Sequence, residues 1–587
     1  MNFLRNFLAA ILGCMVAFGI MCIMFVIFIG LIGSTENVVV VKKNSVLKLQ
    51  LQRPINDYVG DNTMDPFTGA FFEQAQGLDE IIHAISVAKT DDDVNGISID
   101  NNFIMAGLAQ TQAIRKALQD FKESGKFIYT YGDFYMQKDY YLASVADSVF
   151  LNPVGTLDFR GLSSEVLFFK DFQEKTGVKM EVIRHGKYKS AVEPFIANEM
   201  SEANRTQIKT LITSLWNSMV EDISEGRHIA PDNLNTIADT LGGRTPEYAK
   251  ASGLIDDVIF YDEYEKKLRN ALGIGTDDEL NIVYLEDYVF RSNKKVTKKG
   301  KDKIGVVFAQ GEIFYGEGGP DIIGQGIITK ALIRAREDDD VKAIVLRVNS
   351  PGGSALTSDI IWREIEITKA VKPVVVSMGN VAASGGYYIA VGADKIYAEP
   401  TTITGSIGVF GTVPNMADLA DNLGINAEQV GTNKNSIEYS FFEPMSDDFR
   451  NLVQEGIEST YETFLKRVSQ GRNISISEAD SLAQGRVWSG VDAKRIGLVD
   501  ELGNLESAIE EAARMAGLST YGIKKFPKYK SGFERLLENM GGASAKAGEK
   551  IIKEEIGQDT YTILKQIKSA MEQEGVQARM PYILNIQ

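Results

Sequence analysis

One region of this 587-residue chain occurs twice. The run 91–94, Asp-Asp-Asp-Val, returns as 338–341, a shift of 247 positions. The same shift relates three further pairs: 140–141 with 387–388, Asp147 with Asp394, and Pro153 with Pro400. This register holds over about sixty residues, and 253–256 later matches 497–500 at a shift of 244. Self-similarity of this length indicates tandem duplication, so the chain must fold as two related units.

Each copy alternates short β-branched runs with helical patterns. In the second copy the pattern predicts strands and helices in turn: strands at 303–308, 343–348 and 373–378, helices at 327–336 and 358–370, and a further helix from Gly385 onward. Strands of this kind between helices are typical of a buried, mostly parallel sheet. The predicted fold class is therefore α/β.

These patterns divide the chain into five segments: a tail and membrane anchor (1–36), a first repeat (37–290), a basic linker (291–303), a second repeat (304–519) and a C-terminal tail (520–587). The linker carries six lysines. Such a run is typical of a solvated connection, and contact with anionic lipid is the alternative interpretation. The tail from 520 onward carries no motif that assigns it a function.

The N-terminal segment is long and apolar enough to cross a bilayer. Residues 7–33 contain no charge, and 27 helical residues span roughly 40 Å, more than the ~30 Å hydrocarbon core. A cleaved signal peptide is the alternative, but its apolar core would be about half as long. Arg5 and the amino terminus precede the span, which favours a cytoplasmic tail and exported repeats. Lys42 and Lys43, just beyond the span, weaken that orientation signal.

Composition excludes several functional classes. Both cysteines, Cys14 and Cys22, lie in the apolar span, so neither disulfides nor a cysteine-ligated metal are expected in the rest of the chain. The three histidines argue against a histidine-rich metal site or an ordinary Ser-His-Asp system: His83, His185 and His228. A net charge of −17 argues against nucleic acid as a partner.

A candidate nucleophile distinguishes the two copies. Ser384 lies in MGNVAASGGYY (378–388), at a predicted strand-to-helix junction, where the Gly385 N–H can face an oxyanion. Some thirty residues earlier, Gly352 and Gly353 form a loop whose N–H groups can point into the same cleft. The alternative is that Ser384 only caps a helix and the glycines only make a turn. The first copy weakens this alternative, because it has Gln137 in place of Ser384 although it needs the same caps and turns.

A nucleophilic serine needs a base, and lysine can serve when burial lowers its pKa. Lys189 lies in RHGKYKSAVEPF (184–195) of the first copy, and its counterpart at the shift of 247 is Ser436. Each copy thus lacks what the other has, as a site shared between the copies would require. His185 stays a rival base, without a supporting pattern.

Four motifs together resemble the long, duplicated form of the signal peptide peptidase A (protease IV) family: SPGG (350–353), AASGGY (382–387), TGSIGVFG (404–411) and YKSAVEPF (188–195). The resemblance runs from the anchor to at least Gly517. It implies a serine protease of the ClpP/crotonase fold, with Ser384 as nucleophile and Lys189 as general base. It also implies that Ser406, which falls on Phe159 in the first copy, orients the lysine.

The same resemblance implies an oxyanion hole formed by Gly385 with either Gly352 or Gly353. It further implies a homotetramer on the bacterial inner membrane, anchored through 7–33, with catalytic domains facing the periplasm. The implied substrates are cleaved signal peptides and other extended apolar peptides, and the reaction requires neither a cofactor nor a metal. Two alternatives stay open: a crotonase-like acyl-CoA enzyme, and a catalytically silent membrane scaffold.

Overall fold

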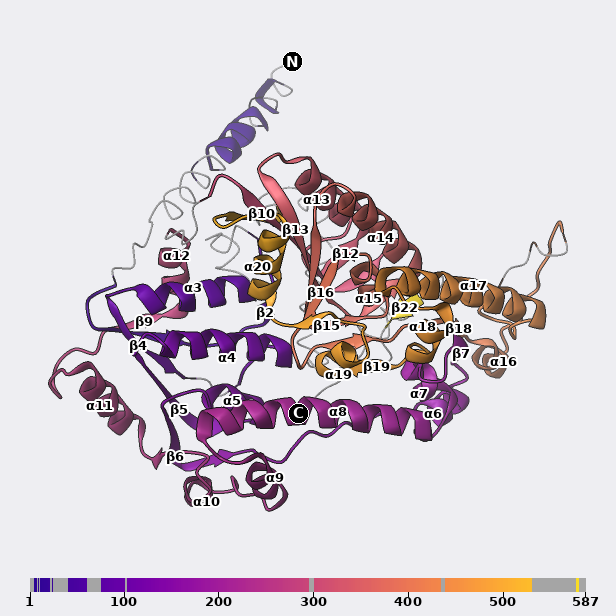
Figure 1. The fold of residues 1–587 in the computed structure, drawn as a ribbon. Coiled ribbons are helices and arrows are strands. Elements are labelled where there is room, and N and C mark those ends of the chain that lie inside the picture. Colours follow the sequence, from indigo (N-terminus) through magenta and orange to yellow (C-terminus); the bar gives the residue numbers. More distant parts are fainter. Residues whose placement is uncertain are drawn as a thin grey trace.

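The protein is described here by a computed structural model, in which the two copies lie side by side (Figure 1). The residues that the structure describes are these: 5–7, 9, 11–21, 24, 41–60, 75–100, 103–294, 300–433, 436, 439–529 and 577–579. The remainder of the predicted anchor, part of the linker and most of the tail lie outside them. The described part of the anchor is helical. Among the described residues, no helix combines the length and hydropathy needed to cross a membrane.

The first copy is built on a six-stranded sheet in which every neighbouring pair is parallel. Its strand order is β8 (Asp257–Val258), β6 (Ser148–Leu157), β5 (Phe127–Tyr135), β4 (Val94–Ile99), β1 (Ser45–Leu49) and β9 (Ile282–Tyr284). Three helices pack together beside it: α3 (Leu78–Thr90), α4 (Leu108–Lys122) and α12 (Leu285–Lys294). On this sheet all five residues of β1 are buried, Val46, Leu47 and Leu49 together with Ser45 and Lys48.

The second copy repeats this plan with an eight-stranded sheet. Its main path is β19 (Val487–Ser489), β17 (Ile403–Gly405), β15 (Val374–Ala383), β13 (Val341–Ser350), β10 (Lys303–Gln310) and β21 (Gly522–Phe526). Two short strands form a branch, in which β16 (Lys395–Ala398) pairs with β15 and β20 (Glu501–Leu502) pairs with β16. Only the β17–β19 pair of this sheet is antiparallel. The α/β class and the mostly parallel sheet predicted from the sequence are confirmed.

The helices of the two copies correspond in order and in length. α13 (Gln325–Glu337) and α14 (Ala355–Lys369) follow α3 and α4 at a shift of 247. The long helices α8 (Glu202–Arg227) and α17 (Asp447–Arg472) differ by 245, and α10 (Pro246–Ala251) and α19 (Gly490–Arg495) by 244. The structure therefore confirms the duplication and locates the lost residues in the loops around the long helices.

A third sheet joins the two copies. Its order is β12 (Ile322–Gly324), β11 (Glu312–Phe314), β14 (Gly352–Ser354), β22 (Gln577–Arg579), β18 (Val409–Asn415) and β7 (Lys179–His185). β7 comes from the first copy and the other strands come from the second copy and the tail. Since β7 and β18 pair antiparallel over seven residues each, backbone hydrogen bonds tie one copy to the other.

Side chains reinforce this union of the copies. Leu211 and Leu215 of α8 pack in an apolar cluster with three residues of the second copy: Ala383, Ile403 and Val487. Burying each leucine stabilises the interface by about 1.5–3 kcal/mol. The carboxylate of Asp57 lies 2.8 Å from the Arg347 guanidinium, and both side chains are 2% exposed. Removing either partner of this ion pair would leave a buried charge alone, so the pair fixes how the copies meet.

Candidate active site

The pairing of β7 with β18 places Lys189, four residues after the end of β7, beside the second copy. His185, at the end of β7, pairs with Val409 at the start of β18, and the chain then turns at Gly186. Gly186 has φ 107°, and a Cβ there would lie 2.7 Å from the Gln484 carbonyl oxygen, so the turn requires glycine. The Tyr188 N–H donates to that same carbonyl at 2.8 Å. These contacts carry the lysine backbone against a loop of the other copy.

The Lys189 amine meets two serines in the interior. Its Nζ lies 2.9 Å from Ser384 Oγ, 3.1 Å from Ser406 Oγ and 3.1 Å from the Ser406 carbonyl oxygen. All three residues are fully buried. Burial alone lowers the pKa of Lys189 well below its usual range, so the amine is held toward its neutral form. A neutral amine has two hydrogens and one lone pair. With both hydrogens directed to Ser406, the lone pair faces Ser384.

Ser384 occupies a strained backbone position. Its φ of 56° and ψ of −115° lie outside the regions that non-glycine residues favour. The strain is held by two backbone bonds, from Ser384 N–H to the Gly405 carbonyl and from Tyr388 N–H to the Ser384 carbonyl, both 2.8 Å. Its side chain makes no capping hydrogen bond to the helix α15 (Gly385–Ala390) that follows. The interpretation of Ser384 as a plain helix cap is therefore wrong.

Ser406 is fixed just as firmly. Its φ is 50°, and its N–H donates to the Arg486 carbonyl at 2.7 Å. The adjoining Ile407 carbonyl accepts from the Gly485 N–H at 2.8 Å. Since the loop 484–486 contacts both Ser406 and the Lys189 backbone, it holds the two partners together. No sequence signal singled out this loop, and only the structure identifies it as part of the site.

The glycine loop lies on the other side of Ser384. Gly352 and Gly353 have φ of 98° and 151°, and a Cβ on Gly353 would lie 2.1 Å from the Ile313 carbonyl oxygen. The Gly352 N–H donates to Ser350 Oγ at 3.2 Å. Gly385 is buried at the first position of α15. The backbone geometry thus explains why glycines stand here, and the choice of the oxyanion donor stays a prediction.

His185 does not reach this cluster. Its ring stacks on Tyr461 with the centroids 4.1 Å apart, and no described hydrogen bond joins it to Lys189 or Ser384. Within the described parts of the chain, no three or more His, Cys, Asp or Glu side chains converge as metal ligands would. The polar chemistry of the site is therefore that of one amine, two hydroxyls and backbone groups.

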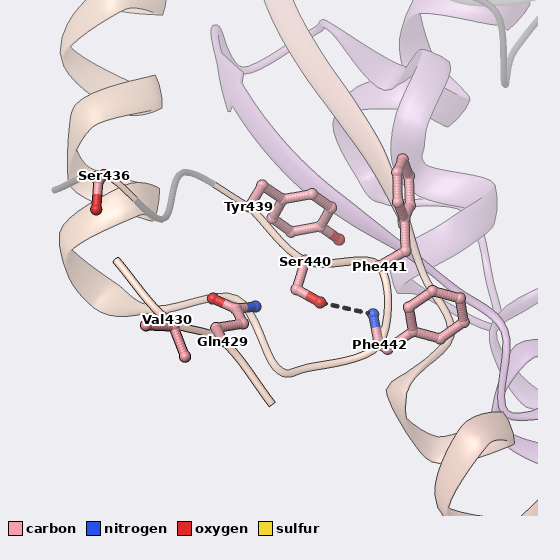
Figure 2. A pocket seen from close by; sticks show the side chains of 7 residues that line it. All are labelled: Gln429, Val430, Ser436, Tyr439, Ser440, Phe441 and Phe442. Atoms are coloured by element: carbon pink, nitrogen blue, oxygen red, sulfur yellow. Dashed lines mark hydrogen bonds between the residues drawn. The ribbon is translucent and has the colours of Figure 1, made fainter. Parts of the chain in front are cut away.

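A surface hollow lies some distance away along β18. It has a volume of about 460 Å³, and Figure 2 shows the seven side chains that line it: Gln429, Val430, Ser436, Tyr439, Ser440, Phe441 and Phe442. Tyr439 donates to the Pro414 carbonyl at 2.8 Å, near the end of β18 farther from Ser406. The hollow contains no acid, base or nucleophile matched to another, so it is not the catalytic site.

Together, a serine on a strained strand-to-helix turn and a buried amine within hydrogen-bond distance define a serine hydrolase type of site.

Comparison with known proteins agrees with this class. The model of "Peptidase family S49" matches residues 120–275 and 366–519, one match in each copy. Protease 4 of Haemophilus influenzae is 39% identical over 74% of this chain and 72% of its own length. Protease 4 of Salmonella typhi is 36% identical over 80% and 77%. The chain therefore belongs to Peptidase family S49 and is a serine peptidase, as the sequence resemblance predicted.

Two further similarities are more remote. The chloroplastic serine protease SPPA of Arabidopsis thaliana is 30% identical over 93% of this chain and 78% of its own length. Among solved structures, a ClpP1 point mutant from Listeria monocytogenes matches 35% of this chain and 94% of that chain, with 16% identity and a TM-score of 0.24.

Proposed function

We propose that this protein is a membrane-anchored endopeptidase that uses Ser384 and Lys189 as a catalytic dyad. The observation that carries the proposal is the 2.9 Å contact between a fully buried lysine amine and a serine hydroxyl from the opposite copy. Desolvation removes the main obstacle to lysine as a base, which is its ordinary pKa of ~10.4. Ser406 serves as the positioning residue for the amine.

The proposed reaction is acyl transfer. The lone pair of neutral Lys189 takes the Ser384 proton as the oxygen attacks the peptide carbonyl carbon. The resulting oxyanion is held by Gly385 N–H with Gly352 or Gly353 N–H. The carbon–nitrogen bond then breaks, and the leaving amine takes the proton from the lysine. Lys189 then takes a proton from water as the water attacks the ester carbonyl carbon, and returns it to the Ser384 oxygen as the carbon–oxygen bond of the ester breaks.

The proposed substrates are cleaved signal peptides and other extended apolar peptides. Support comes from the sequence resemblance and from the strand edges beside Ser384, which suit an extended backbone. Phe410, on β18, lies with its ring centroid 5.8 Å from the Lys189 amine and adds an apolar surface at the reaction centre. No side-chain preference at the cleaved bond is proposed.

A serine-directed fluorophosphonate probe tests the dyad. We expect covalent labelling at Ser384, located by peptide mass spectrometry, and loss of labelling in Ser384→Ala and Lys189→Met. Ser440→Ala, at the surface hollow, is the matched serine control and should label as the parent chain does. Failure of the folded, assembled protein to label at Ser384 would reject the dyad and favour an acyl-CoA enzyme or a silent scaffold.

We further propose that residues 7–33 anchor the protein in the bacterial inner membrane and that the repeats face the periplasm as a homotetramer. The support is the uncharged 27-residue run preceded by Arg5, together with the family resemblance. Protease added to spheroplasts should digest both repeats while a cytoplasmic marker survives. Protection of the repeats, with an exported control protein degraded, would reverse the orientation. Light scattering of the detergent-solubilised protein should give four copies.

A further inference from the structure

A strand from the C-terminal tail lies within the third sheet. β22 pairs antiparallel with β14, where Gln577 faces Ser354, Ala578 faces Gly353 and Arg579 faces Gly352. On its other side β22 pairs antiparallel with β18, where Gln577 faces Phe410. In Figure 1 this strand is the short yellow segment close to β18, far from the end of β21 in sequence. The tail thus occupies the position between two strands of the second copy.

Those two strands are the walls of the candidate active site. β14 carries the glycine loop, and β18 begins three residues after Ser406. In the sheet order β14 and β18 are neighbours of β22 and not of each other. Without the tail strand, each would present an unpaired edge to the gap between them. An extended peptide bound in that gap would pair with both edges through its backbone.

The direction of β22 leads toward the nucleophile. Its residues advance from Ser354 to Gly352, and the Gly352 N–H bonds to Ser350. The Ser350 carbonyl in turn lies so close to Gly386 that a Cβ there would be 2.6 Å away. Since Gly386 is two residues from Ser384, the tail backbone runs from the wall of the cleft toward the reaction centre. Consistent with a covered site, Ser384 has no exposed surface.

We propose that the segment Gln577–Arg579 is a built-in competitor that occupies the substrate cleft of its own chain. The inference rests on the proposed function, because it takes the gap between β14 and β18 as the place where peptide substrates bind. Recognition through backbone pairing does not depend on the identity of the tail side chains. Tethering makes the competition intramolecular, so it depends on the effective concentration of the tail at the cleft and not on the concentration of the protein. Substrate must therefore displace the tail before hydrolysis.

Proline substitution in the full chain tests this directly. Ala578→Pro removes a backbone N–H and disfavours a strand that is paired on both sides. We expect the apparent KM for a fluorogenic peptide to fall about tenfold with kcat unchanged, as releasing a site that is competent about one-tenth of the time would give. Ala545→Pro, in the tail but outside the strand, is the matched control and should leave KM as it is. A chain ending at residue 571 should reproduce the effect of Ala578→Pro.

A binding measurement separates this inference from the proposed function, because it needs no turnover. A fluorescent peptide with the sequence of residues 572–582 is titrated into Ser384→Ala protein with and without Ala578→Pro. We expect binding about tenfold tighter with Ala578→Pro. Equal affinities and equal KM values, in protein that hydrolyses peptides, would overturn the tail inference alone. A tenfold difference in affinity without any hydrolysis by the parent chain would uphold the tail inference and reject the peptidase assignment.

Discussion

The two repeats share one architecture but differ in the residue at the end of the corresponding strand, which is Ser384 in the second copy and Gln137 in the first. In the second copy, Ser384 stands at the end of β15 with its hydroxyl facing a lysine. In the first copy its counterpart Gln137 accepts from the N–H groups of Arg160 and Gly161 at 2.9 and 2.8 Å, and donates to the Gly161 carbonyl at 2.9 Å. The Gly161 counterpart, Gly408, lies beside the Lys189 side chain. One of these contacts is shared between the copies, because Ser384 Oγ donates to the Gly408 carbonyl at 3.5 Å as Gln137 does to the Gly161 carbonyl.

The remaining partners differ in the same sense. Phe159, the counterpart of Ser406, is buried between aromatic rings, with centroids 5.7 Å from Tyr140 and 5.3 Å from Trp216. Ser384 and Ser406 have positive φ, whereas Gln137 and Phe159 do not. Strained backbone thus occurs where the chemistry is proposed and is relaxed where it is absent. The comparison teaches that the first copy, which supplies Lys189 but no serine, has hydrogen-bonded or ring-packed side chains at the positions of the two strained serines.

The glycine loop shows the same contrast. In the first copy the Ile104 N–H donates to the Asp139 carboxylate at 2.7 Å, whereas its counterpart in the second copy, Pro351, has no N–H. Asp139 stands at the position of Gly386, which has no side chain to offer. Burial raises the pKa of Asp139 to about 6. The second copy has neither this N–H nor this carboxylate at the loop.

The largest expected effect is loss of the dyad. Ser384→Ala and Lys189→Met should each lower kcat/KM by at least about 10⁴-fold, since each removes half of one catalytic unit. The double variant should be no worse than either single one. Gln137→Ala and Lys187→Met are the controls from the first copy and should keep activity within about threefold of the parent chain. Hydrolysis of a fluorogenic peptide is the measurement.

One result would refute this assignment of the base. If Lys189→Met hydrolysed the peptide at a near-normal rate and His185→Ala did not, the histidine would be the base. The absence of a lysine at the position of Lys189 in the second copy would then say nothing about catalysis.

Ser406→Ala should have the next largest effect. The hydroxyl orients the amine but forms no bond to substrate, so we expect kcat to fall about 10- to 100-fold, less than for Ser384→Ala. The remaining Ser406 carbonyl still accepts one amine hydrogen. Ser406→Thr, which restores a hydroxyl, should recover part of the rate. A Ser406→Ala protein with unchanged kcat and an unchanged pH profile would show that the hydroxyl does not position the lysine.

The pH dependence tests the protonation state of Lys189. The base must be neutral, so kcat/KM should rise about tenfold per pH unit below the lowered pKa of Lys189 and level off above it. Ser406→Ala should move the midpoint of this rise because one hydrogen-bond partner of the amine is lost. A profile that is flat from about pH 5 to 10, measured where acylation limits the rate, would exclude a titrating lysine in this window.

A smaller effect concerns stability. The lowered folded-state pKa of Lys189 means that the unfolded chain binds more protons than the folded one, so stability rises with pH up to the unfolded pKa of ~10.4. Lys189→Met removes this cost and should raise Tm at pH 7, with a smaller gain at pH 10. Each kcal/mol gained corresponds to roughly 2–4 °C. Lys187→Met, two residues away, should leave Tm unchanged in thermal unfolding. A lower Tm for Lys189→Met at both pH values would contradict a desolvated lysine.

The smallest predicted effect lies at Glu399, whose counterpart in the first copy is Asn152. Burial raises the pKa of Glu399 to about 7 from 4.5, and its Oε1 has no hydrogen-bond partner among the described residues. The folded protein therefore holds this proton more tightly, and up to about 3 kcal/mol of stability is lost as pH rises from about 4.5 to about 7. Glu399→Gln should remove this loss, as seen in urea unfolding at pH 5 and pH 8. If the free energy of unfolding of Glu399→Gln changed between pH 5 and pH 8 as much as that of the parent chain, the predicted effect of Glu399 would be disproved.

Much of the fold and of the candidate site could be predicted from the sequence, because comparing the two copies shows which residues one copy has and the other lacks. Ser384 and Lys189 could be singled out because each is missing from the other copy, and the alternation of elements indicated parallel sheets. The 484–486 loop could not be found in this way, since its contacts to Lys189 and Ser406 are made by backbone atoms that any sequence carries. The same holds for β22, which binds through backbone pairing and leaves no side-chain pattern to recognise.

The pairing of β7 with β18 also decides when during synthesis the site can exist. Lys189 and Ser384 are 195 residues apart, and a ribosome adding ~5–20 residues per second makes the proposed base roughly 10 to 40 s before the proposed nucleophile. The loop at 484–486 follows later still. A nascent first repeat therefore has the Lys189 amine without its serine partners, and an N-terminal fragment that ends before Ser384 cannot form the cluster. If Ser384 and Lys189 act as proposed, a chain can cleave a peptide only after both repeats have been synthesised.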